Sequence, residues 1–305
     1  MSELETLIAD ELAQPVDPRV SAFAASIAAS YGAAARAVLF YGSCLRTTEL
    51  EGQMLDFYLI VSSYEEAYGK SWLVGANRRL PPNVFPAEHG GLVAKVAVLS
   101  DEDFHRLNRI AASAVSVWAR FAQPARLAWH ADGPVQAQVV EAIAGAPVTL
   151  FDLTRPMMDT DTEYGILDLW KRGFELTYGA ELRAERKDRS GSVVDSDPER
   201  YARFGSAVAA TIAERDQGRG RGPTSPDSRK AAEKRWRQLR RNGKLLTLAR
   251  LAKASATYAG GIDYLAWKIN RHAGTDYVIR PWQRKWPILG ALVMLPRLVM
   301  GGAIK

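Results

Sequence analysis

Apolar positions in the first half of the chain change repeatedly between helical and strand spacing. Val20, Phe23, Ile27 and Tyr31 recur every three or four residues, which predicts a helix over Glu3–Ala34. Short apolar runs between polar segments predict strands, and longer stretches predict further helices. The strands are expected at Ala37–Tyr41, Leu55–Val61 and Gly91–Leu99, and the helices at Ser71–Phe85, ended by Pro81-Pro82, and Asp101–Phe121. This order predicts an α/β domain with a small mixed sheet over residues 1–145.

The second half of the chain has a different pattern. Gln136–Ala213 looks mainly helical, so we expect a second, helical domain at 146–215. Asp216–Arg229 contains Gly, Pro, Ser and charges without an apolar period, which predicts a flexible linker at 216–229. The basic segment Arg229–Lys253 that follows is open to a simpler interpretation as a solvated tether.

The last part of the chain, 230–305, is predicted to be a basic amphipathic tail that contacts a membrane. Apolar residues from Tyr258 to Ile269 fall on one helical face, while Lys268 and Arg271 point elsewhere. The tail also contains tryptophans beside cations, namely Trp267, Trp282 and Trp286. The apolar run Pro287–Leu295 is about half of the roughly 20 residues that a bilayer span needs. We therefore expect a helix lying in the headgroup layer, and a kinked span or an internal, oligomer-forming helix are the alternatives.

Charge divides the chain in the same place as the hydropathy pattern. Arg229–Lys305 carries 17 Lys and Arg against 3 Asp and Glu, whereas the preceding residues have a net charge of −8. Such a tail is expected to meet an anionic partner, either a nucleic acid or a phospholipid surface. The single cysteine, Cys44, excludes an internal disulfide and is interpreted as a small packing residue rather than a catalytic thiol. The acidic N-terminus lacks a signal-peptide core, so we expect a cytoplasmic protein.

The candidate chemistry lies in Phe40–Val61. Tyr41, Gly42 and Ser43 end a strand, and Asp56 follows on the next strand, thirteen positions after the serine. A Gly-Ser turn lets backbone N–H groups approach phosphates, and a neighbouring carboxylate can hold the Mg²⁺ that bridges them. The pattern favours nucleotidyl transfer over an ordinary hairpin.

One departure from the usual Asp-x-Asp strand motif changes the expected acceptor. Tyr58 stands at the second acidic position, and the third strand offers Lys95 instead of an acid. A hydroxyl acceptor needs a base, but a phosphate monoester is already an anion at neutral pH, because its second pKa is about 6. We therefore expect a phosphate acceptor, steered by Lys95 and by nearby arginines, with Arg46, Arg78 and Arg79 as the candidates. Loss of catalysis with retention of binding is the alternative.

Several segments in register resemble the mitochondrial-type phosphatidate cytidylyltransferases (the translocator assembly and maintenance family). They are YGSC, QMLDFYLIV, Trp72 with Asn77 and Asn83, AKVAVLSDEDF, WARFAQPARL and YGILDLWKRGFELTYGAELRAE. The likeness covers residues 35–200 in order. Cys44 in place of a glycine, Ala122 and Ala125 in the Gln-Pro turn, and the linker depart from the family pattern.

The resemblance implies formation of CDP-diacylglycerol and pyrophosphate from CTP and phosphatidate, with Mg²⁺ or Mn²⁺. It also implies a nucleotidyltransferase domain, a winged-helix-like domain and a C-terminal membrane-contacting helix, attached peripherally to the inner face of a membrane. The residues that match the family are Tyr41, Gly42, Ser43, Asp56, Lys95, Glu181 and Arg183. Together with the arginines proposed above, the expected roles are catalysis by Asp56, Lys95 and Ser43; nucleotide binding by Tyr41, Gly42, Ser43, Arg46, Asn77 and Lys95; metal binding by Asp56 and Glu181; and acceptor-phosphate binding by Arg78, Arg79 and Arg183. A structural ion pair between Glu181 and Arg183 is the simpler interpretation of those two residues.

Two other functions stay open on the sequence. The first is a nucleotidyltransferase that acts on a nucleic acid or on a small polar acceptor. The second is a nucleotide-binding module without catalytic activity. The apolar run and tryptophans of the tail argue against a nucleic-acid partner, and a homodimer is compatible with the pattern without being required by it.

Overall fold

The structure, a computed structural model, describes residues 1–47, 49–159, 163–181, 193–218, 226–257 and 278–285. It is an α/β protein built on one mixed, five-stranded sheet in the order β3-β4-β2-β1-β5. The strands are β1 (Ala35–Tyr41), β2 (Met54–Val61), β3 (Asn83–His89), β4 (Leu92–Ser100) and β5 (Ala125–His130). Only β2 and β4 run parallel, and the other neighbours are antiparallel.

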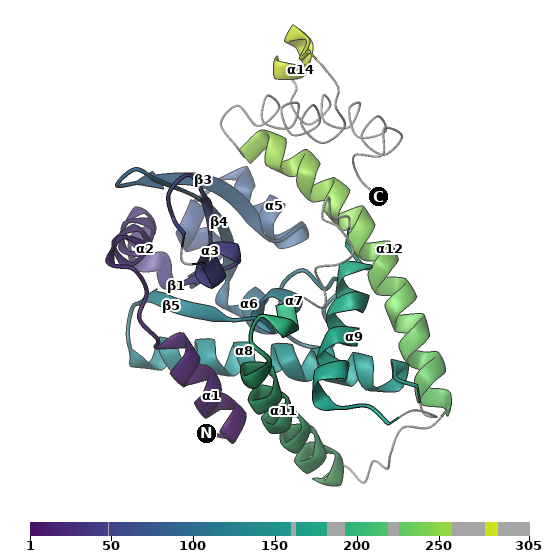
Figure 1. Cartoon of the computed structure of the whole chain (residues 1–305). Coiled ribbons are helices and arrows are strands. Elements are labelled where there is room, and N and C mark those ends of the chain that lie inside the picture. The colour runs from purple at the N-terminus through teal and green to yellow at the C-terminus, as the bar shows by residue number, and fades with distance from the viewer. Residues whose placement is uncertain (48, 160–162, 182–192, 219–225, 258–277, 286–305) are drawn as a thin grey trace.

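Helices cover both faces of this sheet (Figure 1). One face packs against α2 (Pro18–Tyr31) and α4 (Tyr64–Tyr68), with Phe23 and Phe57 at its centre. The other face packs against a larger group of helices. That group comprises α1 (Glu3–Leu12), α6 (Asp101–Leu107), α7 (Trp118–Phe121), α8 (Gly133–Thr154), α9 (Ile166–Tyr178), α11 (Pro198–Gly218) and α12 (Pro226–Thr257). Three shorter or peripheral helices and two 3-10 turns complete the described residues: α3 (Ser43–Thr47), α5 (Trp72–Arg79), α14 (Pro281–Lys285), η1 (Gly32–Ala34) and η2 (Arg155–Met157).

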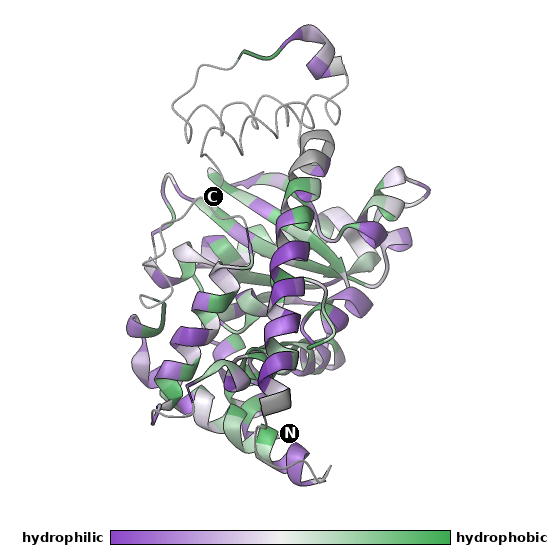
Figure 2. Ribbon diagram, turned by 90° about the vertical axis from the view of Figure 1, so that its right-hand side faces the viewer, coloured by the Kyte–Doolittle hydropathy of each residue, from purple (hydrophilic) through white to green (hydrophobic). Residues whose placement is uncertain are grey.

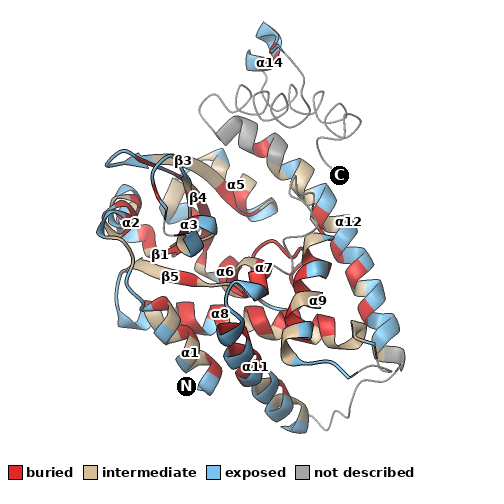
Figure 3. Ribbon diagram, viewed as in Figure 1, coloured by how far each residue is buried: buried red, intermediate tan, exposed pale blue. Residues whose placement is uncertain are grey.

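The strand pattern explains why the sequence signal was clear for the central strands. The residues of β2 from Phe57 to Val61 are all buried, because both faces of the strand are covered. Figure 3 shows buried residues, in red, in the helices that pack around the sheet. The predicted strands at Ala37–Tyr41, Leu55–Val61 and Gly91–Leu99 are confirmed within two residues at each end. β3 and β5, which pair along only one side, were not predicted.

Three predicted helices were partly wrong. Glu3–Ala34 is interrupted because Asp17 caps α2 by accepting a hydrogen bond from the backbone N–H of Arg19. The helix at Ser71–Phe85 ends at Arg79, and Asn83 already belongs to β3.

The third error was the continuous helix at Asp101–Phe121. The backbone is irregular between α6 and α7, and α12 supplies the hydrogen-bond partners that a helix would have provided. Arg235 donates to the carbonyl oxygens of Ile110 and Ala112, and Asn242 donates to that of Ser113. A tertiary contact therefore decides the conformation of this segment.

The basic segment Arg229–Lys253 is not a solvated tether. It lies within α12, which runs along the body and contacts η2, α8 and β3 (Figure 1). Figure 2 shows mostly hydrophilic turns on the face of α12 toward the viewer. Trp236 is fully buried and donates from Nε1 to the Leu153 carbonyl oxygen at 2.8 Å.

The predicted boundaries fall differently on the observed helices. The boundary between residues 145 and 146 lies inside α8, and the buried residues of α8, α9 and α11 share one core with the sheet. Of the predicted linker, Asp216–Gly218 belongs to α11 and Pro226–Arg229 to α12. The winged-helix-like arrangement stays a prediction.

Candidate active site

Strand register brings three predicted site residues side by side. Asp56 lies opposite Tyr41 on β1 and opposite Lys95 on β4. Directly opposed residues of adjacent strands point to the same face of a sheet. All three therefore lie on the sheet face that also carries Tyr58, near the C-terminal end of β1.

The Gly42 turn lies directly against the Asp56 carboxylate. Gly42 has φ +95°, and a Cβ atom there would stand 2.8 Å from Asp56 Oδ2. An L-residue would be strained in this conformation and would also collide with the carboxylate. Ser43 follows at the start of α3 and is exposed. Glycine is thus required for the carboxylate to reach the turn.

Tyr58, at the position of the missing second acid, forms an aromatic wall. Its ring centroid lies 5.2 Å from those of Tyr41 and Phe121. Burial raises the pKa of Tyr41 and of Tyr58, so both phenols are neutral at pH 7. The wall leaves Asp56 as the single carboxylate supplied by β2.

A half-buried arginine that the sequence reasoning missed lies within electrostatic range of Asp56. Arg120 of α7 interacts electrostatically with Tyr58, Tyr41, Glu181 and Asp56. Burial lowers the pKa of Arg120, but these neighbours raise it by more. Because the two tyrosines are neutral, Glu181 and Asp56 are the charged groups among these neighbours, and Arg120 Nη1 also donates a hydrogen bond to the Ser116 carbonyl oxygen. The signal was present in the motif WARFAQPARL, where Arg120 follows the buried Trp118 and Ala119.

Glu181 comes to the same site from the helical half of the chain. It follows the end of α9 and interacts with Tyr58, Arg120 and Arg250. Both carboxylates that were predicted to hold a metal therefore lie within electrostatic range of Tyr58 and of the half-buried Arg120. Arg183, predicted to bind an acceptor phosphate or to pair with Glu181, lies outside the described residues.

Arg250 and Lys253 are further cations that the sequence reasoning missed. Buried or half-buried positions of α12 recur at alternating intervals of four and three residues, at Ala232, Trp236, Leu239, Gly243, Leu246, Arg250 and Lys253. This row, the α12 seam, changes from apolar to cationic as it reaches the sheet. The same spacing was the available sequence signal for both residues.

The last two residues of the α12 seam are held by backbone and hydroxyl oxygens. Arg250 donates to the Pro81 carbonyl oxygen at 2.9 Å and to Ser116 Oγ at 2.9 Å. Lys253 donates from Nζ to the carbonyl oxygens of Leu80 and Pro82. Burial, together with the neighbouring positive charge of Arg250, lowers the pKa of Lys253 to about 7.

Other predicted binding residues lie elsewhere. Asn77 is fully buried and donates to the Val98 carbonyl oxygen at 2.9 Å, which is a packing role. Arg78 is exposed and forms an ion pair of 2.7 Å with Glu65, and Arg79 is exposed at the end of α5. Arg46 lines a separate polar cavity. Cys44 is buried, as expected for a packing residue.

The residues around Asp56 fit a magnesium ion in part. Mg²⁺ keeps several waters and is typically bound through one or two carboxylates together with substrate phosphates. The turn at Gly42, where the absence of a Cβ leaves room beside the Asp56 carboxylate, fits a magnesium ion bound through one carboxylate and substrate phosphates. No group of three or more His, Cys, Asp or Glu side chains suited to a metal occurs in the part of the chain that the structure describes.

The predicted membrane residues fall mostly outside the described ranges. Trp267 and Trp286 are not described, and Trp282 lies on α14 with 41% of its surface exposed. Within the described residues, no helix has the length and apolar character needed to cross a membrane.

Comparison with known proteins adds no assignment to this geometry. Neither a protein-family model nor a curated protein matches the chain.

Proposed function

We propose that the protein is a nucleotidyltransferase that transfers a cytidylyl group from CTP to a lipid phosphate such as phosphatidate, releasing pyrophosphate. The observation that carries this proposal is the Asp56 carboxylate lying against the Gly42 turn, with Lys95 opposite it on the next strand. CTP and phosphatidate as substrates rest on the sequence resemblance alone.

The charge around Asp56 supports a polyphosphate ligand. Lys95, Arg120 and Arg250 bring three positive charges near two carboxylates, Asp56 and Glu181. Burial lowers the pKa of Arg250, yet an arginine stays protonated in proteins. A site with buried cations in excess favours a ligand that carries several negative charges.

The proposed chemistry is an in-line displacement at the α-phosphorus of the nucleotide. An oxygen of the acceptor phosphate forms a bond to that phosphorus, the bond to the bridging oxygen breaks, and pyrophosphate leaves with the electron pair. The Gly42 and Ser43 backbone N–H groups would bind the outer phosphates, and Lys95 with Arg120 would orient the anionic acceptor. A bound Mg²⁺ or Mn²⁺ would neutralise phosphoryl charge, held by Asp56 and Glu181.

This chemistry explains why one strand carboxylate suffices. The acceptor phosphate is already an anion at pH 7, since its second pKa is about 6, so no side chain has to remove a proton. Tyr58 can therefore replace the second acid without loss of a catalytic base.

The test is pyrophosphate release by the full chain with each nucleoside triphosphate and a panel of lipid phosphates in detergent. We expect turnover with CTP and a lipid phosphate, and at least about a thousandfold loss in Asp56→Asn with an unchanged circular dichroism spectrum. Asp101→Asn, an acidic residue at the start of α6, serves as the matched control. Release with hydroxyl acceptors but not with lipid phosphates, or full activity in Asp56→Asn, would refute the proposal.

The attachment to a membrane is a separate proposal that rests on the sequence of the tail. Co-sedimentation with anionic liposomes is the expected result, and retention on RNA instead would favour the nucleic-acid alternative.

A further inference from the structure

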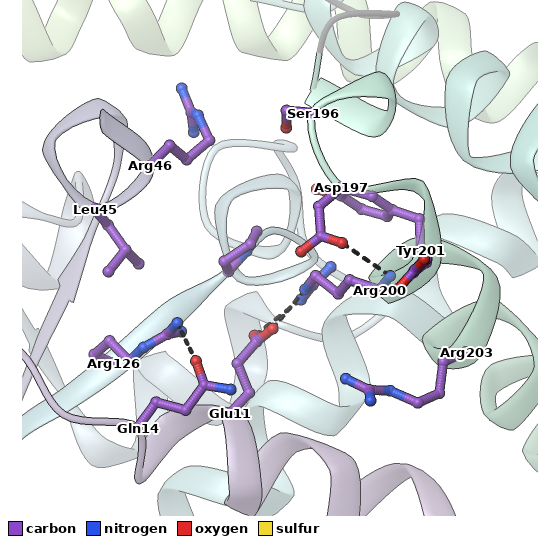
Figure 4. A pocket seen from close by; sticks show the side chains of 12 residues that line it. Glu11, Gln14, Leu45, Arg46, Arg126, Ser196, Asp197, Arg200, Tyr201 and Arg203 are labelled. Carbon is purple, nitrogen blue, oxygen red and sulfur yellow. Dashed lines mark hydrogen bonds and ion pairs between the residues drawn. The ribbon is translucent and has the colours of Figure 1, made fainter. Parts of the chain in front are cut away.

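A polar cavity of about 330 Å³ lies beside the Gly-Ser turn, outside the candidate active site (Figure 4). It lies between the end of α1, the helix α3, the start of β5 and the beginning of α11. Twelve residues line it, and Tyr41, Asp56 and Lys95 are not among them. Its volume is at the lower end of the range for small-ligand sites, which is about 300 to 1,000 Å³.

Four arginines from three elements line this cavity, which we call the arginine cavity. They are Arg46 of α3, Arg126 of β5, and Arg200 and Arg203 of α11. Glu11 is committed to Arg200, with two contacts of 2.5 and 2.9 Å between the guanidinium and the carboxylate. Asp197 accepts a hydrogen bond of 3.0 Å from the backbone N–H of Arg200. Glu11 and Asp197 are thus engaged within the protein, whereas Glu199, the third acidic residue of the lining, is exposed to solvent.

Arg126 is a half-buried cation without a carboxylate partner among the described residues. Its guanidinium donates to the side-chain oxygen of Gln14 and to the carbonyl oxygen of Ala125. Burial lowers the pKa of Arg126, and the neighbouring Arg200 lowers it further against the opposing effect of Glu11. The positive charge of Arg126 is therefore incompletely compensated.

Three residues that line the arginine cavity each carry a buried donor atom without a hydrogen-bond partner in the described structure, and the Arg200 guanidinium stacks over the rings of Tyr201 and Phe204. The donor atoms are Arg126 Nε, Arg200 Nη1 and Tyr201 Oη. Burial raises the pKa of Tyr201 to about 12, so its hydroxyl keeps its proton at neutral pH. A buried donor without an acceptor costs about 1–3 kcal/mol, and such groups in a native protein call for an unseen acceptor.

We infer that the arginine cavity binds a phosphate group, as free phosphate or as the headgroup of a phosphate monoester lipid. Phosphate matches the chemistry on three counts: its oxygens accept several hydrogen bonds, its charge compensates Arg126, and arginine is the preferred partner for planar, bidentate recognition of such oxygens. This inference does not depend on the proposed reaction.

The test is isothermal titration of the full chain with inorganic phosphate at low salt. We expect saturable binding that weakens at least tenfold, about 1.4 kcal/mol, in Arg126→Gln. Arg203→Gln, in which an exposed lining residue is changed, should weaken binding without affecting the fold. Arg109→Gln is the matched control, because Arg109 pairs with Glu141 at the surface and does not line the cavity.

Two comparisons separate this site from the candidate active site. Lys95→Gln and Asp56→Asn should keep the phosphate binding that Arg126→Gln weakens, whatever their effect on binding at the candidate active site. Unchanged phosphate affinity in both Arg126→Gln and Arg203→Gln, or loss of all phosphate binding in Lys95→Gln, would overturn the inference.

The source of the phosphate is distinguished with vesicles. Phosphatidylcholine vesicles with and without phosphatidic acid are sedimented with the protein, with and without free phosphate as a competitor. A lipid ligand predicts phosphatidic-acid-dependent sedimentation that Arg126→Gln reduces, whereas a free phosphate ligand predicts titration signals without such dependence.

Discussion

At Gly42, a single backbone conformation decides whether a carboxylate can reach the phosphate-binding turn. The residue combines φ +95° with an approach of 2.8 Å between a virtual Cβ and Asp56 Oδ2. Conformational strain and direct contact therefore act on the same position. The two effects can be measured separately, because other glycines of the chain have positive φ but no atom within 4 Å of a Cβ at that position.

We predict that Gly42→Ala lowers turnover by about a hundredfold or more, because displacing the carboxylate by even about 1 Å misaligns the reacting groups. It should also lower the free energy of unfolding by about 1–2 kcal/mol, the cost of a left-handed conformation for an L-residue. Pyrophosphate release and urea denaturation measure the two effects.

The matched control for that prediction is Gly91→Ala. Gly91 lies between β3 and β4 with φ +78°, and no atom lies within 4 Å of its virtual Cβ. The variant should lose similar stability and keep its activity. Equal activity losses in the two variants would show that backbone strain alone, not the approach to Asp56, is responsible.

Among the elements, α12 determines how the site is assembled. Its seam buries Trp236 beside Trp118, with ring centroids 6.2 Å apart, and its polar side chains bind the segment that leads to Arg120. The same helix brings Arg250 toward Glu181 and Tyr58. The basic helix α12, which the sequence alone suggests is solvent-exposed, thus packs against the body and contributes Arg250 to the site.

Gly243 is the position at which α12 packs most closely against the residues before Glu181, and replacing it should have an unexpected effect on stability. Gly243→Ala should destabilise the protein by about 1–3 kcal/mol, although alanine favours a helix over glycine by about 1 kcal/mol. A Cβ at Gly243 would lie 2.1 Å from the Ala180 carbonyl oxygen and would push α12 away from the residue that precedes Glu181. Urea denaturation followed by tryptophan fluorescence measures the change.

Gly218→Ala provides the control, because Gly218 ends α11 and nothing lies within 4 Å of its virtual Cβ. That variant should stay within about 0.5 kcal/mol of the wild type. A neutral or stabilising Gly243→Ala would contradict the observed docking of α12.

For the whole molecule, one core joins the sheet to the helices of both halves of the chain. Leu39 and Tyr58 of the sheet share it with Trp170 of α9, Tyr201 of α11 and Trp236 of α12. Such shared burial predicts a single cooperative unfolding transition for the described body. Groups buried within it therefore report on global stability.

Lys253 predicts a specific dependence of global stability on pH. Its pKa is about 7 when folded, against 10.5 for an ordinary lysine, so the unfolded chain binds one more proton between these values. The free energy of unfolding should therefore rise as pH rises from about 7 to 10.5. The neutral amine has two N–H groups for the carbonyl oxygens of Leu80 and Pro82, and the nearby charge of Arg250 disfavours the ammonium form.

We expect Lys253→Met to remove this part of the slope. Urea denaturation at several pH values across that interval, compared with the wild type, measures it. Lys244→Met, an exposed position on the same helix, should leave the slope unchanged. Parallel curves for wild type and Lys253→Met would show that Lys253 is charged in the folded protein.

By itself, the sequence determined the parts of this protein that depend on local pattern. Continuous apolar runs located β1, β2 and β4, and the Gly-Ser turn followed by Asp56 located one side of the site, because burial and turn chemistry are written in neighbouring residues. Only the tertiary structure decided the rest. Arg120 and Arg250 come from segments distant from β2, and Glu181 was expected only from the family resemblance. Their spacing in the sequence indicates a buried position, but it does not indicate which other part of the chain each side chain contacts. The irregular segment before α7 and the docking of α12 depend on each other, because side chains of α12 donate hydrogen bonds to backbone carbonyl oxygens of that segment.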